Sequence, residues 1–150
     1  MFDWCRRIFA SHDRRSAAAR AGGEGERLAA EFLRRERGYA LVACNWRNPR
    51  DRRGELDLVM RDGGALVFVE VKTRAAGALV SGYHAVDERK RDALRRAITA
   101  YLAGLRAKPG TVRFDVIEVS LAPAGEDGRQ SPPEIHHFAG VPLFPPRWRP

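Results

Sequence analysis

Cysteine is scarce in this chain of 150 residues, which contains only Cys5 and Cys44. Two cysteines are too few for a disulfide framework, so we expect a protein of a reducing compartment, the cytoplasm. Long apolar runs are also missing, and no stretch reaches the roughly 20 residues that a membrane-spanning helix needs. The first residues contain no apolar segment of the kind found in secretory signals. These absences indicate neither a secreted scaffold nor a membrane partner.

Several catalytic signatures are absent as well. The sequence contains no phosphate-binding P-loop and no glycine-rich dinucleotide-binding fingerprint. Nothing in it offers a nucleophilic serine or cysteine with a histidine partner. We therefore expect neither nucleotide-dependent chemistry nor a covalent serine or cysteine mechanism.

The net charge of +8 is concentrated at the two ends of the chain. Residues 1–20 hold five arginines against two aspartates, and Arg147 and Arg149 add two further positive charges. Such ends suit contact with nucleic-acid phosphates without choice of sequence, and they equally suit a merely solubilising role. The length fits one domain. The predicted organisation is a basic N-terminal arm (1–21), a single domain (22–140) and a proline-rich C-terminal tail (141–150).

The most informative stretch is Gly54 to Arg74, GELDLVMRDGGALVFVEVKTR, which predicts a β-hairpin. Its first half alternates apolar and polar residues, and Gly63-Gly64 supplies a tight turn. Its second half is a nearly unbroken apolar run, typical of a strand buried on both faces. Glu70 and Lys72 interrupt that run two residues apart and therefore share one face.

The expected register of this hairpin brings carboxylates together. With Gly63-Gly64 as a two-residue loop, Asp57 faces Glu70 and Glu55 faces Lys72. Directly opposed side chains have Cβ atoms about 5 Å apart. Two carboxylates at about that distance repel by about 3 kcal/mol at an effective dielectric near 20. A divalent cation with oxygen ligands would relieve this repulsion, with Lys72 as a positive charge beside it.

A second interpretation of the same residues stays open. Glu70 and Lys72 also fit an exposed strand face on which Glu55 forms a cross-strand salt bridge. Taken singly, each residue fits that interpretation at least as well. The full set favours the metal site, because a solvated face would not usually align Leu66 and Phe68 with the charges.

These motifs resemble the Asp…Glu-x-Lys core of the PD-(D/E)xK nuclease superfamily. More closely, the chain resembles the YraN family of small bacterial proteins, which is similar to archaeal Holliday-junction resolvases. The resemblance covers roughly residues 22–140. It rests on GELDLV, VFVEVKTR, GEGERLAAEFL, the Asn45–Arg47 sequence NWR, Lys90 and RFDVIEV at Arg113–Val119. One departure is Leu56, which stands where the superfamily often has proline before the aspartate.

The resemblance implies a restriction-endonuclease-like fold and a Mg²⁺-dependent endonuclease acting on DNA, with Mn²⁺ able to substitute. It implies that Asp57 and Glu70 hold the metal with help from the Val71 carbonyl. Lys72 would then orient or activate the attacking water and stabilise charge on the scissile phosphate. The substrate implied is branched or otherwise structured DNA, and a dimer is possible.

Further site candidates flank the hairpin. A predicted helix from Glu24 to Arg37, ended by Gly38, carries Glu26 at the edge of its apolar stripe. Glu26 either favours the helix dipole or leans over the sheet as an extra active-site carboxylate, and Glu55 is a similar candidate. The candidates for binding nucleic acid are Arg47, Arg50, Arg52, Arg53, Arg74 and Lys90. Most of these arginines fall in a polar loop, for which ordinary solvation is the simpler alternative.

The order of predicted elements gives an α/β fold with a mixed central sheet flanked by helices. The remaining elements expected are a strand at Tyr39–Trp46, a helix at Val86–Leu105, and strands at Val112–Leu121 and Glu134–Phe138. Asp115 and Glu118 fall on opposite faces of their strand and receive no role in the site. Alongside the nuclease, a non-catalytic nucleic-acid-binding module on the same fold remains an alternative function.

Overall fold

The computed structural model describes residues 17–75, 87–122 and 131–148 of the chain. Within these ranges the predicted order of one helix, three strands, one helix and two strands is confirmed. The elements are α2 (Ala17–Glu36), β1 (Ala40–Asn48), β2 (Asp51–Asp62), β3 (Ala65–Ala75), α3 (Glu88–Ala103), β4 (Thr111–Leu121) and β5 (Glu134–Phe138). None of the helices in these ranges has both the length and the apolar character needed to cross a membrane.

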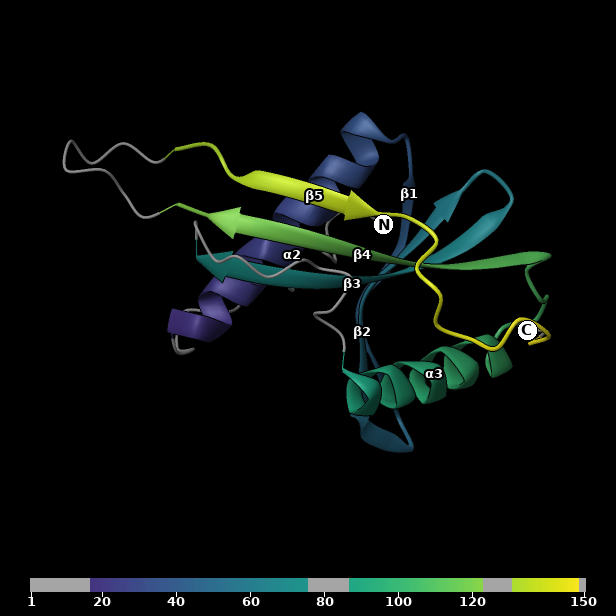
Figure 1. Cartoon of the computed structure of the whole chain (residues 1–150). Coiled ribbons are helices and arrows are strands. Elements are labelled where there is room, and N and C mark those ends of the chain that lie inside the picture. The colour runs from purple at the N-terminus through teal and green to yellow at the C-terminus, as the bar shows by residue number, and fades with distance from the viewer. Residues whose placement is uncertain (1–16, 76–86, 123–130, 149–150) are drawn as a thin grey trace.

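The five strands form one sheet in the order β1-β2-β3-β4-β5. The β3–β4 pair is parallel, and the other three pairs are antiparallel. A parallel pair needs a crossover connection, which α3 provides between β3 and β4. The two helices lie on opposite faces of the sheet (Figure 1). The predicted mixed sheet flanked by helices is thus confirmed, and it is compatible with a restriction-endonuclease-like fold.

Strand β3 is almost wholly apolar because it contributes to a core on each side of the sheet. Leu66 and Phe68 pack against α3, in one cluster with Ile98. Val67 and Val69 point the other way and pack against α2. This alternation follows the two-residue period of a strand. Glu70 therefore continues the α3 side of the strand, where Leu66 and Phe68 lie.

Helix α2 is longer than predicted at its N-terminal end. It begins at Ala17 instead of Glu24, so Gly22 and Gly23 lie inside the helix and do not separate an arm from it. Glycine only weakens a helix by about 1 kcal/mol, and tertiary packing outweighs that preference. The predicted end is confirmed, since Gly38 has a φ of 71° directly after the helix. Residues 1–16 of the expected arm lie outside the described residues.

A third glycine, Gly25, lets α2 approach the sheet closely. A Cβ atom at this position would lie 1.9 Å from Thr73 Oγ1 and 3.0 Å from Thr73 Cβ. Gly22, one turn earlier, has no described atom within 4 Å of such a Cβ. Gly25 thus sets the distance between β3 and the helix that carries Glu26.

We expect Gly25→Ala to destabilise the protein by about 1–3 kcal/mol, because the helix must move away from Thr73. The matched control, Gly22→Ala, removes a helix glycine without a clash and should stabilise by up to about 1 kcal/mol. Urea denaturation of both variants measures the difference. Equal stability of the two variants would show that the close contact does not determine the helix position.

The segment expected to be an extended tail packs on the domain over residues 141–148. Val141 and Leu143 are buried in the core on the α3 side of the sheet. Arg95 of α3 donates from Nε to the Leu143 carbonyl at 2.7 Å. The rings of Phe144 and Trp148 stack with centroids 3.8 Å apart. Residues 141–148 therefore pack against α3 as part of the domain.

Candidate active site

The predicted hairpin register is confirmed from the turn outward, up to the point where the pairing of β2 with β3 ends. Asp62 faces Ala65, and the paired residues continue to Leu58 and Val69. Beyond this point β2 diverges from β3, and Asp57 fills the opening with its side chain. Its Oδ2 accepts a hydrogen bond from the Val71 N–H at 2.8 Å. A carboxylate thus replaces the backbone ladder where the strands separate.

The predicted pairing of Glu55 with Lys72 is wrong. Glu55 instead lies opposite Arg47 on β1, and the two side chains form an ion pair at 3.0 Å. The physical reason is the divergence of the strands, since this end of β2 stays paired with β1 and no longer pairs with β3.

Strand β1 is also longer than predicted. Asn48 and Asp51 belong to strands, so only a two-residue turn remains between β1 and β2.

Glu70 is the centre of a charged cluster on the α3 side of the sheet. Its side chain is 2% exposed, and its Oε1 lies 2.8 Å from Lys72 Nζ and 3.1 Å from Lys90 Nζ. Its Oε2 is buried and has no hydrogen-bond partner among the described residues. Lys90 comes from the first turn of α3, where Asp87 caps the helix by accepting from the Lys90 N–H at 2.8 Å. An acceptor that is buried without a partner suits a bound cation.

The electrostatics connect Asp57 to the same cluster. Burial and the nearby Glu70 carboxylate raise the pKa of Asp57 to about 8, against the opposing influence of the Val71 N–H and Lys90. The charge of Glu26 raises it further. Burial alone would lower the pKa of Lys90, but the Glu70 and Asp57 carboxylates outweigh burial and raise it. Raised carboxyl pKa values of this kind are common at functional sites.

The second-tier carboxylates lie around this cluster. Glu26 is close enough to act on the Asp57 charge, as expected for a residue at the sheet-facing edge of α2. Glu55 acts on Lys90 in the same way. Any role of Glu26 and Glu55 in the chemistry stays a prediction.

The basic residues predicted to bind nucleic acid are only partly described. Arg47 pairs with Glu55, and Arg50 is exposed in the β1–β2 turn. The side chains of Arg52 and Arg53 lie outside the described part of the chain. Three of the set make intramolecular ion pairs: Arg47, Arg74 with Glu118, and Lys90 with Glu70. Only Pro49 and Arg50 of the expected polar loop lie outside the strands, and a role of these basic residues in binding nucleic acid stays a prediction.

One neighbouring carboxylate could not be identified from the sequence. Glu118 on β4 lies in register with Lys72, on the same side of the sheet, and is 8% exposed. Its Oε1 is 3.5 Å from Arg74 Nε. Only the parallel β3–β4 register brings these residues together. The signal available in the sequence was a buried-strand pattern followed by a helix and another such strand, which favours parallel pairing.

The residues present fit a small, hard divalent cation. Among the described residues, no group of three or more histidine, cysteine, aspartate or glutamate side chains could hold a metal. Asp57 and Glu70 would offer a cation two carboxylates, as Mg²⁺ often uses when waters and a substrate phosphate complete its coordination. The N–H and C=O of one strand residue point to the same side. The Val71 carbonyl accordingly points toward β2 and is a suitable third ligand.

The pKa of Asp57 predicts a pH dependence of stability in the absence of metal. The folded pKa of about 8 exceeds the reference value of 3.8, so the folded protein retains a proton that the unfolded chain releases. Stability from this group is therefore complete below about pH 4 and is lost as the pH rises through 8.

We expect the free energy of unfolding in EDTA to fall by roughly 1–3 kcal/mol between pH 5 and 8, relative to Asp57→Asn. The value is reduced from full linkage because the Asp57 side chain is only partly buried and solvent screens its charge. Chemical denaturation of both proteins across this range measures the difference. Parallel pH profiles would contradict the raised pKa.

Comparison with known proteins finds a family and relatives that match most of this chain. The model of the uncharacterised protein family UPF0102 matches residues 25–119. A UPF0102 protein of Symbiobacterium thermophilum is 47% identical over 106 residues, which cover 71% of this chain and 86% of that protein. One from Frankia alni is 42% identical over 120 residues, covering 80% and 92%. One from Chlorobaculum parvum is 41% identical over 117 residues, covering 78% and 87%.

The matched region includes every residue of the Asp57–Glu70–Lys72 cluster, as well as Lys90 and Glu118. The predicted resemblance to the YraN family is confirmed at the level of the family. The chain belongs to the UPF0102 family.

Proposed function

We propose that the protein is a metal-dependent endonuclease that hydrolyses phosphodiester bonds in DNA, with branched or otherwise structured DNA as its substrate. One observation carries the proposal. Asp57 and Glu70 converge where β2 leaves β3, with one buried Glu70 oxygen unpaired and Lys72 beside it. A core strand of a stable protein rarely tolerates such an arrangement unless function requires it.

The metal would be held by Asp57, Glu70 and the Val71 carbonyl. A bound Mg²⁺ supplies polarisation of a phosphoryl oxygen and a lowered pKa for water. Lys72 orients the attacking water and stabilises negative charge that develops on the scissile phosphate. These groups lie on strands, which hold side chains in a more precise position than loops do. Glu26 adds a carboxylate from α2 at the edge of the site.

The direct experiment incubates the purified protein with labelled linear, flapped and four-way-branched DNA in the presence of Mg²⁺ or Mn²⁺. We expect cleavage that requires the metal, stops with EDTA and is faster on structured DNA than on the linear duplex. No cleavage of any of these substrates with either metal would reject the nuclease. The same assay on single-stranded and double-stranded RNA determines whether DNA is preferred.

The second candidate is a nucleic-acid-binding module without catalysis. The observation in its favour is that Glu70 already pairs with two ammonium groups of the protein itself. An ion-paired cluster of this kind could stabilise the domain with no chemical role. Binding without cleavage, retained in EDTA, would favour this candidate.

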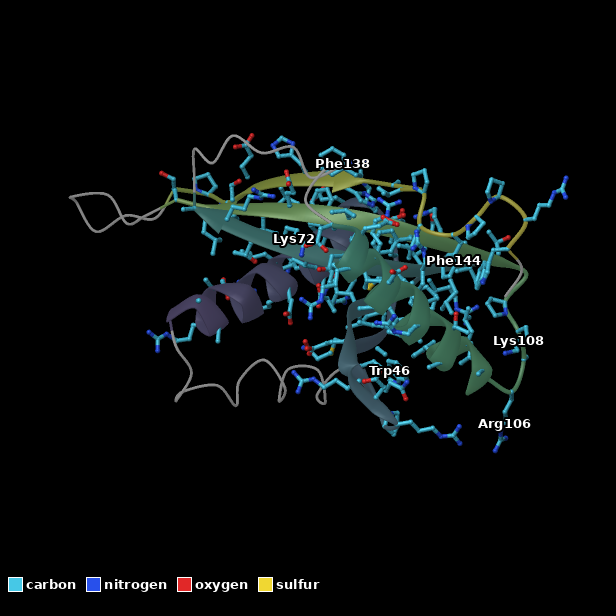
Figure 2. The ribbon with its side chains drawn as sticks, turned by 60° about the horizontal axis from the view of Figure 1, so that its bottom comes forward. Trp46, Lys72, Arg106, Lys108, Phe138 and Phe144 are labelled. Atoms are coloured by element: carbon cyan, nitrogen blue, oxygen red, sulfur yellow. The ribbon has the colours of Figure 1, made fainter. Side chains whose placement is uncertain are left out.

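Both candidates predict that nucleic acid is bound through phosphates. The exposed Arg50 lies in the β1–β2 turn at the end of β2 that packs against α3 through Gly54. Lys72 is on the sheet near the start of α3, whereas Arg106 and Lys108 lie beyond the other end of that helix (Figure 2). Arg50 and Arg106 therefore offer two exposed arginines for comparison, one in the turn predicted to bind nucleic acid and one beyond the far end of α3.

We expect Arg50→Ala to weaken duplex binding and to lower the log–log salt slope by about 0.9, the value for one lost phosphate contact. Arg106→Ala, the control, should leave the slope unchanged. Fluorescence anisotropy at several salt concentrations measures both. Affinity that does not change with salt would exclude phosphate binding for wild-type protein.

A further inference from the structure

Two lysines share one oxygen of Glu70, and this sharing conflicts with the proposed metal. Lys72 and Lys90 both reach Oε1, at 2.8 Å and 3.1 Å, while Oε2 remains buried and without a partner. A divalent cation on Oε2 would lie close to two ammonium groups and would be repelled by both. Metal binding is therefore favoured when one ammonium leaves Glu70.

Lys90 is the ammonium that can leave. Lys72 belongs to the same strand as Glu70, two residues away on the same side, so its backbone fixes it beside the carboxylate. Lys90 reaches Glu70 from α3 across the opening, at the longer of the two distances. Its side chain is 36% exposed against 28% for Lys72. A lysine has a flexible four-carbon stem, so Lys90 can move toward solvent while α3 stays in place.

A nucleic-acid phosphate would give the displaced ammonium a new partner. Lys90 Nζ lies 3.1 Å from Glu70 Oε1 and its side chain is partly exposed, so a phosphate bound at the proposed metal would be within its reach. The phosphate also adds negative charge beside the metal, which strengthens metal binding further. Metal and nucleic acid should then help each other to bind, and this coupling must be equal in both directions.

We propose that Lys90 is an internal counterion of Glu70 that yields its place to the metal and transfers to the phosphate backbone of the bound nucleic acid. The inference rests on the proposed metal site. Lys90 thereby keeps the affinity of the free protein for the metal low. The affinity rises when nucleic acid binds and Lys90 moves to its phosphate. Its role is that of a positioning residue, since it acts through Glu70.

Two titrations test this role without measuring cleavage. Calorimetry gives the affinity of the free protein for Mn²⁺, and anisotropy gives the affinity for a short duplex with and without Ca²⁺, with a gel to check that the duplex stays intact. Lys90→Met keeps the length of the side chain and removes its charge. Arg89→Met, a charge loss on the neighbouring exposed residue of α3, is the control. Thermal melting confirms that both variants fold.

We expect Lys90→Met to bind Mn²⁺ about tenfold more tightly than wild type. We also expect Ca²⁺ to strengthen duplex binding by wild type about tenfold and to have little effect on Lys90→Met. Arg89→Met should behave as wild type in both respects.

Three results would overturn the inference, and they separate it from the nuclease proposal. Unchanged Mn²⁺ affinity in Lys90→Met, with metal-dependent cleavage by wild type, rejects the counterion and leaves the nuclease intact. Equal effects of Lys90→Met and Arg89→Met on both affinities would show that Lys90 acts only through the overall charge of the protein. Absence of Mn²⁺ binding in wild type and Lys90→Met alike rejects the metal site and the inference together.

Discussion

Lys72→Ala is expected to lower the rate of DNA cleavage by about 10²–10³-fold while metal binding persists. The ammonium of Lys72 lies 2.8 Å from Glu70 Oε1, so it is held at the carboxylate that would bind the metal. A charge fixed in this way stabilises the transition state without the cost of reorganising solvent. Alanine removes the charge but neither of the metal-binding carboxylates. Single-turnover cleavage with Mn²⁺ measures the loss.

The matched control is Lys108→Ala. Lys108 donates to the Leu102 carbonyl at 2.6 Å and lies beyond the far end of α3 (Figure 2). Loss of this contact should cost stability and leave the cleavage rate of the folded protein unchanged. Cleavage by Lys72→Ala at the wild-type rate would show that the activity is a contaminant or belongs to another site.

Asp57→Asn is expected to remove both cleavage and the stabilisation that metal confers. Asparagine has nearly the same volume, and it loses the negative charge that attracts the cation. With wild type, a ligand at 100 times its Kd stabilises by about 2.7 kcal/mol, or roughly 5–10 °C in Tm for a domain of this size. Asp57→Asn should show no such shift. In EDTA at about pH 8 or above it should also melt above wild type, because asparagine avoids the repulsion between the Asp57 and Glu70 carboxylates.

Thermal melting in EDTA and in rising Mg²⁺ or Mn²⁺ measures these shifts. Asp92→Asn is the control, since Asp92 is an exposed partner of Arg95 at 2.6 Å on α3. It should keep the full response to metal. A wild-type melting curve that does not change at millimolar metal would count against a metal site at Asp57 and Glu70.

Local patterns in the sequence were sufficient to predict the hairpin and the position of its charges. Gly63-Gly64 fixed the register from Asp62 and Ala65 to Leu58 and Val69. The register beyond that point was wrong because the strands diverge. Past Leu58, β2 leaves β3 but stays paired with β1 as far as Asp51. The point at which a central strand loses one of its two neighbours is not visible in the hairpin alone.

Long-range packing explains the other differences. Gly22 and Gly23 read as a helix boundary, yet α2 continues through them because its later residues are fixed by the core. Val141 and Leu143 lie in a proline-rich stretch whose sequence does not predict a core element. They belong to the core because the chain returns to pack on the α3 side of the sheet. The role of Lys90 likewise depends on how α3 crosses the sheet, since nothing in its local sequence indicates contact with Glu70.

The most direct test of the central claim is a crystal structure of the wild-type protein soaked with Mn²⁺, with anomalous data collected at the manganese absorption edge. The structure predicts one strong anomalous peak between the carboxylates of Asp57 and Glu70, within bonding distance of the Val71 carbonyl. Lys72 should remain beside Glu70. A map without a peak at that position, with Mn²⁺ present at millimolar concentration and Lys72 and Lys90 both still on Glu70 Oε1, would contradict the account.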